Sequence, residues 1–135
     1  MWDTEGFTDT NLDIVGIPYC ALDVIKSTDP NARVNGVAFK VSDSHLEALK
    51  KREHDYKLIE TTAYDFVTNQ SLETCLLFSA NKNNGRYEFG SSVQKRYLTL
   101  CLEGSKDYGD EFYTEFLRTT FIGGKPLAEF PELIT

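Results

Sequence analysis

The sequence predicts an α+β domain with four or more strands and two or three helices on one side of them. Val37, Phe39 and Val41 alternate with Ala38 and Lys40, as in a half-buried strand, and residues 56–67 are typical of a long strand with apolar residues on both faces. Ser44 and Ser91 each begin a capping box, with Glu or Gln in the third following position. Apolar residues at helical spacing follow each box, so strand and helix patterns are mixed along one chain.

The elements follow one another without an internal repeat or a linker, so we expect a single domain that covers residues 1–135. Strands are expected over residues 20–26, 34–41, 56–67 and 73–80, and helices from Ser44, from Ser91 or Ser92, and from about Asp110 to Phe121. Turn-forming residues at 27–31 predict a hairpin between the first two strands. Gly36 inside the second strand indicates a bulge or a close approach of the backbone.

Helical spacing also predicts which residues face the core. The helix after Ser91 should bury Val93, Tyr97, Leu98, Cys101 and Leu102, and the next helix should bury Phe112, Phe116, Leu117 and Phe121. The tail after Gly124 carries Leu127, Phe130 and Leu133, which should pack as a short strap.

Composition and charge argue against several classes of protein. The chain has 135 residues, of which 41% are hydrophobic and 26% charged, as in ordinary globular domains. Its longest apolar run is far shorter than the roughly 18 residues that a membrane span needs. Its net charge of −7 argues against nucleic acid or an anionic membrane as a partner. Cys20, Cys75 and Cys101 are widely spaced among apolar neighbours, so we expect reduced, buried thiols in a cytoplasmic protein.

Glu53 is out of place in the pattern of the helix that begins near Ser44. Leu46, Leu49 and Glu53 fall at i, i+3 and i+7 and therefore share one helical face. Two interpretations follow. The helix frays near Arg52 and Glu53 is a solvated charge at its end, or Glu53 continues the apolar stripe and its carboxylate is buried.

Two groups of residues carry a resemblance to a known family. The first is Val34-Asn35-Gly36-Val37-Ala38-Phe39 followed, after the predicted helix, by Arg52-Glu53-His54-Asp55-Tyr56 and a strand. The second runs from Ser91 through Tyr97 to Cys101-Leu102-Glu103-Gly104 and Tyr108-Gly109. In this order they resemble the γ-glutamylcyclotransferase-like superfamily, which includes γ-glutamylcyclotransferases, γ-glutamylamine cyclotransferases and the ChaC type. The resemblance covers roughly residues 31–121.

The resemblance implies a fold, an activity and a site. It implies a small mixed sheet that is curled into a barrel-like form with helices around it. Glu53 falls on the family's catalytic glutamate, which acts as general acid and base in closing a γ-glutamyl group to 5-oxoproline. The implied substrate-binding residues are Tyr97, Tyr56, Phe78 and Gly36. The reaction uses a small-molecule γ-glutamyl substrate and needs no metal or organic cofactor.

The front of the chain departs from the family pattern. The family's first strand leads into a Tyr-Gly-Ser-type loop that holds the glutamyl group, and no part of residues 1–26 matches it. We therefore expect a domain without that strand and loop, with residues 12–17 lying extended against the sheet in its place. An alternative from another functional class is a non-catalytic or truncated family member that serves as a binding or assembly domain. An open sheet edge would then favour a homodimer.

Overall fold

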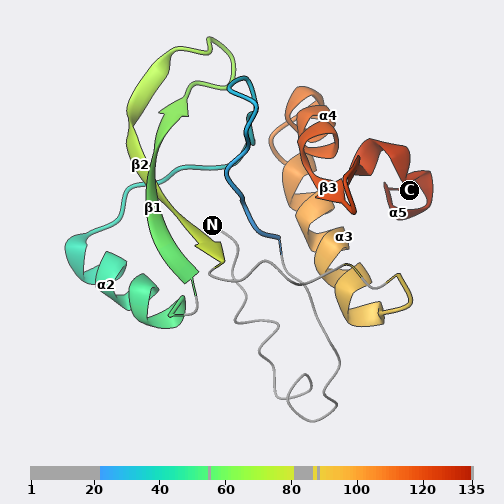
Figure 1. The fold of residues 1–135 in the computed structure, drawn as a ribbon, viewed down its shortest axis with the longest axis horizontal. Helices are drawn as coiled ribbons and strands as arrows, with labels where there is room; N and C mark the ends of the chain where they lie inside the picture. The colour runs from blue at the N-terminus through green and yellow to red at the C-terminus, as the bar shows by residue number, and fades with distance from the viewer. Residues whose placement is uncertain (1–21, 55, 81–86, 88, 135) are drawn as a thin grey trace. The chain divides into compact units, whose positions relative to one another are not determined.

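The computed structural model describes residues 22–54, 56–80, 87 and 89–134 (Figure 1). These residues belong to two compact units, one with residues 22–27, 36–54 and 56–80 and one with residues 28–35, 87 and 89–134. Helices and antiparallel strand pairs occur together, which confirms the α+β class. No helix in the described residues is long and apolar enough to span a membrane. The predicted positions of residues 12–17 and of Cys20 lie outside the described residues.

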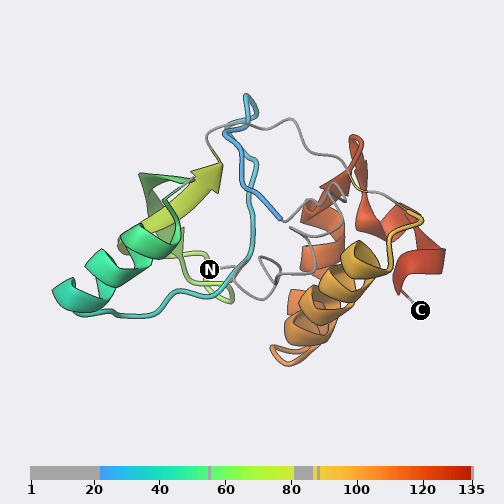
Figure 2. The same cartoon turned by 90° about the horizontal axis from the view of Figure 1, so that it is seen from below.

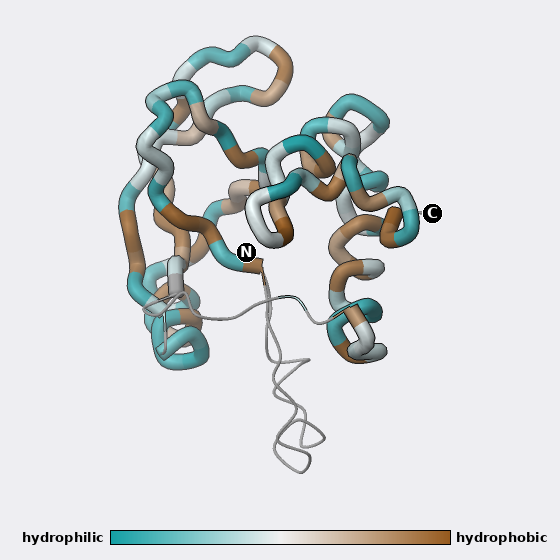
Figure 3. Tube along the Cα trace, turned by 45° about the vertical axis from the view of Figure 1, so that its right-hand side comes forward, coloured by the Kyte–Doolittle hydropathy of each residue, from teal (hydrophilic) through white to brown (hydrophobic). Residues whose placement is uncertain are grey.

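In the first unit, helix α2 covers Asp43–Arg52 and begins earlier than the sequence predicts. The Oγ of Ser42 accepts a hydrogen bond from the backbone N–H of His45 at 3.2 Å, so Ser42 is the N-cap. The predicted capping box at Ser44 is wrong because Asp43, whose charge suits the first turn, already extends the helix. Apart from its buried Leu49, α2 is mainly hydrophilic (Figure 3).

Strand β1 (Tyr56–Tyr64) pairs with β2 (Ser71–Ala80) in an antiparallel hairpin, which confirms the prediction of two strands here. The turn lies at the end of the hairpin that is remote from α2 (Figure 1). Asp65 ends β1 because its Oδ1 accepts the backbone N–H groups of Val67 and Thr68 at 2.9 and 2.8 Å. Bonds from Thr68, with a smaller contribution from Val67, hold the pKa of Asp65 below its ordinary value.

Two predicted strands are absent from the described residues. Neither 22–26 nor 34–41 is a strand, so the predicted hairpin between them is wrong, although a turn does occur at residues 28–31. The apolar alternation over 34–41 did not predict the structure correctly. Val37 and Phe39 are exposed, and no strand within the described ranges pairs with this segment. Gly36 therefore lies in no strand, and the predicted bulge is wrong.

The described strands form two-stranded antiparallel sheets. One is β1 with β2, and the other is β3 (Phe121–Ile122) with β4 (Lys125–Pro126). No closed barrel is present in the described part of the chain. A side-chain hydrogen bond, and not strand pairing, connects residues 22–27 to the β1–β2 hairpin. In the first unit Ser79 donates through Oγ to the carbonyl of Val24 at 2.7 Å.

The second unit is built on α3 (Ser92–Lys106) and α4 (Asp110–Thr119), which pack together (Figure 2). Ser91 is the N-cap of α3, as predicted, and its Oγ accepts from the N–H of Gln94 at 3.3 Å. Gly109 joins the two helices with φ 99°, a conformation that favours glycine. Asn35 connects residues 28–35 to α4, because its Nδ2 donates a hydrogen bond to the carbonyl of Phe112 at 2.9 Å.

The predicted apolar faces of α3 and α4 are largely confirmed. The buried residues of this unit's core are Tyr97, Leu98, Cys101, Leu102, Phe112, Phe116, Leu117 and Leu127. Two residues depart from the prediction. Val93 is only half-buried, and Phe121 is 59% exposed because α4 ends at Thr119 and Phe121 lies in β3. The tail continues through a 3₁₀ helix (η1, Leu127–Glu129) into α5 (Pro131–Ile134).

Leu127 closes this core and has 0% of its surface exposed. Leu127→Ala should lower the free energy of unfolding by about 2–5 kcal/mol, because the lost transfer free energy adds to that of a cavity. Urea unfolding followed by circular dichroism measures this loss. The matched change at exposed Leu100 should cost far less, and equal losses at the two positions would contradict the packing described.

Candidate functional site

Glu53 lies between α2 and β1 and is held there by its backbone. It is the C-cap of α2, with φ −96° and ψ 39°, and its N–H donates to the carbonyl of Leu49 at 2.9 Å. Its own carbonyl accepts from the N–H of Tyr56 at 2.9 Å. The end of α2 and the start of β1 thus both hold the backbone of Glu53 in place.

The side chain of Glu53 is buried. The residue is 4% exposed, so the interpretation of Glu53 as a solvated charge at a frayed end is wrong and the buried alternative is confirmed. The preceding residue, Arg52, compensates the negative charge of the Glu53 carboxylate. Arg52 donates from Nε to Glu53 Oε1 at 3.2 Å, with 24% of the Arg52 side chain exposed. A buried carboxylate needs such a partner, because burying an unpaired charge is costly.

The other carboxylate oxygen, Oε2, accepts no hydrogen bond from the described residues. Within the described ranges, Arg52 is the only residue whose side chain bonds to the Glu53 carboxylate, and it does so through Oε1. An ionised carboxylate can accept about four hydrogen bonds through its two oxygens. Glu53 therefore keeps acceptor capacity at Oε2, which suits a ligand that brings N–H or O–H donors.

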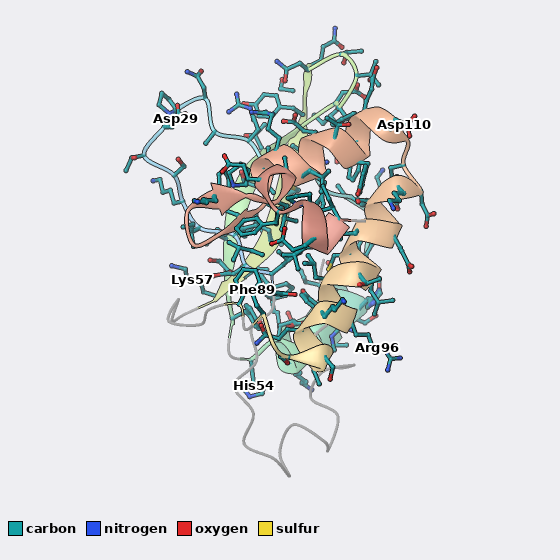
Figure 4. All side chains as sticks on the ribbon, turned by 90° about the vertical axis from the view of Figure 1, so that its right-hand side faces the viewer. Asp29, His54, Lys57, Phe89, Arg96 and Asp110 are labelled. Carbon is teal, nitrogen blue, oxygen red and sulfur yellow. The ribbon has the colours of Figure 1, made fainter. Side chains whose placement is uncertain are left out.

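The surroundings of Glu53 in the sequence are basic. Lys50, Lys51 and Arg52 occupy the last turn of α2, where cations interact favourably with the helix dipole. Lys50 is paired with Glu47 at 3.0 Å on the exposed side of the helix. His54, which follows Glu53, is exposed (Figure 4), and so is His45.

Tyr97 belongs to the second unit, on α3, and is 8% exposed, whereas its neighbour Arg96 projects outward (Figure 4). Burial raises the pKa of the Cys101 thiol to about 12, and a hydrogen bond with the Tyr97 side chain acts in the lowering direction. Tyr97 and Glu53 belong to different units, and the substrate-binding role of Tyr97 stays a prediction.

Tyr56 and Phe78 both lie in the first unit, on the hairpin. Tyr56 is paired with Ala80 and Leu58 with Phe78, so both aromatic residues point to the same face of the hairpin. Each is half-buried. Gly36 is exposed, and a Cβ placed on it would meet no atom within 4 Å, so the expected close approach of the backbone is wrong. The substrate-binding roles of these residues stay predictions.

Several buried polar residues escaped the sequence analysis. Gln94 is 1% exposed and Ser105 is also buried, both on α3. Gln94 precedes Tyr97 by three positions and Leu98 by four, so its helical spacing contained the signal for burial. Among the described residues, no group of three or more His, Cys, Asp and Glu side chains is placed to hold a metal ion.

Comparison of the chain with family models, with curated proteins and with solved structures found no significant match.

The two described cysteines should differ in reactivity. Cys101 is buried with a pKa of about 12, so very little thiolate exists at pH 8, whereas Cys75 is half-buried. Mass spectrometry after brief iodoacetamide treatment should find Cys75 alkylated well before Cys101. Both should react at similar rates in urea. Equal labelling of the two residues in the folded protein would contradict the burial of Cys101.

Proposed function

We propose that this chain is a γ-glutamylcyclotransferase-like enzyme that closes a γ-glutamyl group to 5-oxoproline and releases an amine, amino acid or peptide. The observation that carries this proposal is the carboxylate of Glu53, which is 4% exposed, is held at Oε1 by Arg52 and accepts no hydrogen bond at Oε2 from the described residues. Glu53 is also the residue that the resemblance matches to the family's catalytic glutamate. The turn between α2 and β1 supports the proposal because it fixes the backbone of this residue.

The reaction suits a single carboxylate. The α-amino nitrogen of the substrate attacks its own γ-carbonyl carbon, forming the C–N bond of a five-membered lactam, and the C–N bond to the leaving nitrogen breaks. Attack is intramolecular, so ring closure profits from a high effective molarity. One proton must leave the attacking nitrogen and one must reach the leaving nitrogen. Glu53 carries out both transfers as general base and then general acid.

The amino group of the substrate also matches the free acceptor capacity of Glu53. A primary amine or ammonium brings two or three N–H donors, and Oε2 accepts none from the described residues. Hydrogen bonds to a charged group in a site of low dielectric are stronger than in water. The same oxygen therefore recognises the amino group and removes its proton.

The rest of the proposal follows the resemblance. Tyr97, Tyr56, Phe78 and Gly36 contribute to the substrate site of a single barrel-like domain. The substrate is a small molecule, no cofactor takes part, and the protein acts in the cytoplasm.

Replacement of the base tests the proposal. Glu53→Gln keeps the shape of the side chain and removes its ability to take up a proton, so release of 5-oxoproline should fall by about 100- to 10,000-fold. The assay measures 5-oxoproline from γ-glutamyl dipeptides, γ-glutamylamines and glutathione by mass spectrometry. Glu47→Gln, on the exposed face of the same helix, is the matched control and should retain full activity. Undiminished release by Glu53→Gln would refute the role of Glu53.

A second candidate function is a non-catalytic binding or assembly domain. It is favoured by the hairpin, because Leu72 and Leu76 on one face of β2 are exposed and no third strand of the described residues pairs with β1 or β2. Strand edges of this kind pair with other chains, here a second copy in a homodimer. Failure of the unaltered protein to release 5-oxoproline from every substrate, together with a dimer in sedimentation, would favour this candidate.

A further inference from the structure

Arg52 and Glu53 are neighbours in the chain, which is an unusual origin for an ion pair at a helix. Side chains at i and i+1 diverge on a helix surface and do not face each other. Arg52 is the last residue of α2, however, and Glu53 has ψ 39°, outside the helical range. Because the helix ends between them, the guanidinium Nε reaches Oε1 at 3.2 Å.

This pair is anchored more firmly than a surface salt bridge. The Glu53 side chain is 3% exposed and the backbone on either side of it is hydrogen-bonded to Leu49 and Tyr56. The surface pair Lys50–Glu47 has side chains that are 43% and 66% exposed, and such pairs constrain geometry little. Of these two ion pairs, the Arg52–Glu53 pair is therefore the one that holds a buried carboxylate in a defined orientation.

We propose that Arg52 is a positioning residue, whose Nε–H fixes Oε1 of Glu53 so that Oε2 is the oxygen presented to the substrate's amino group. This inference rests on the proposed function. The terminal torsion of a glutamate is broad and roughly two-fold, so an unheld carboxylate would turn and exchange its oxygens. Arginine suits the task because its N–H groups lie in one rigid plane and it is weakly hydrated.

The first test separates positioning from binding. Arg52→Met keeps an apolar stem of similar length and removes the N–H donor. We expect kcat for γ-glutamylalanine to fall by about 100-fold, the effect of a misplaced reacting group, while KM changes little. Arg118→Met removes another arginine that is paired with a glutamate, Glu115 on α4, and should leave kcat unchanged. If Arg52→Met does not fold, Arg52→Lys, which keeps the charge and lacks Nε–H, should lose kcat in the same way.

The second test detects the contact without turnover. In ¹⁵N-labelled protein the Nε–H resonance of Arg52, assigned by its loss in Arg52→Met, should shift in Glu53→Gln, whereas that of Arg118 should not. Unchanged kcat in the Arg52 variants, a loss confined to KM, or an Nε–H resonance that ignores Glu53→Gln would each overturn this inference and leave the proposed function standing. An unaltered protein that releases no 5-oxoproline from any substrate would instead refute the proposed function, and with it the role given to Arg52.

Discussion

One ion pair, between Arg52 Nε and Glu53 Oε1 at 3.2 Å, accompanies the burial of a carboxylate at the end of α2. Removing one partner of a buried pair typically costs about 3–5 kcal/mol, because the other charge is left without compensation. A carboxylate that is 4% exposed would therefore be an expensive feature with no partner at all. Among the described residues it has one side-chain partner, on one oxygen, so it retains the capacity to accept a further hydrogen bond. In the proposed function, Glu53 would use that remaining acceptor capacity to take up and return a proton.

Local structure around this pair explains how the sequence produces it. Ser42 starts α2, basic residues suit its last turn, and the helix ends at Arg52. The following N–H of Tyr56 caps the carbonyl of Glu53 as β1 begins. At the other end of the β1–β2 hairpin, Asp65 ends β1, because its side chain accepts hydrogen bonds from the backbone N–H groups of Val67 and Thr68. Each boundary is set by a side chain or backbone bond of short range.

Predictions from sequence succeeded where a pattern was local and was reinforced by a second signal. Ser91 caps α3, and Tyr97, Leu98, Cys101 and Leu102 are buried, because a cap and an apolar stripe agreed. The prediction failed for residues 34–41, where alternation alone cannot supply the strand that a ladder requires. The N-cap role of Ser42 was not predicted, because the capping-box pattern that begins at Ser44 lies only two residues away. The buried state of Glu53 was one of two open alternatives, and the choice between them needed the structure since spacing does not show where a helix ends.

Binding of an amino group at Oε2 of Glu53 can be tested directly by NMR of protein labelled with ¹³C at the glutamate carboxyl carbons. Glu53→Gln identifies the Glu53 signal by its loss. The probe is a γ-glutamyl dipeptide analogue in which a CH₂–CH₂ unit replaces the scissile amide, so that it binds and does not react. We expect this analogue to shift the Glu53 signal, whereas its N-acetyl derivative, which lacks the free amine, should not. An equal response to both compounds, or no response to either, would contradict the binding of an amino group at Oε2.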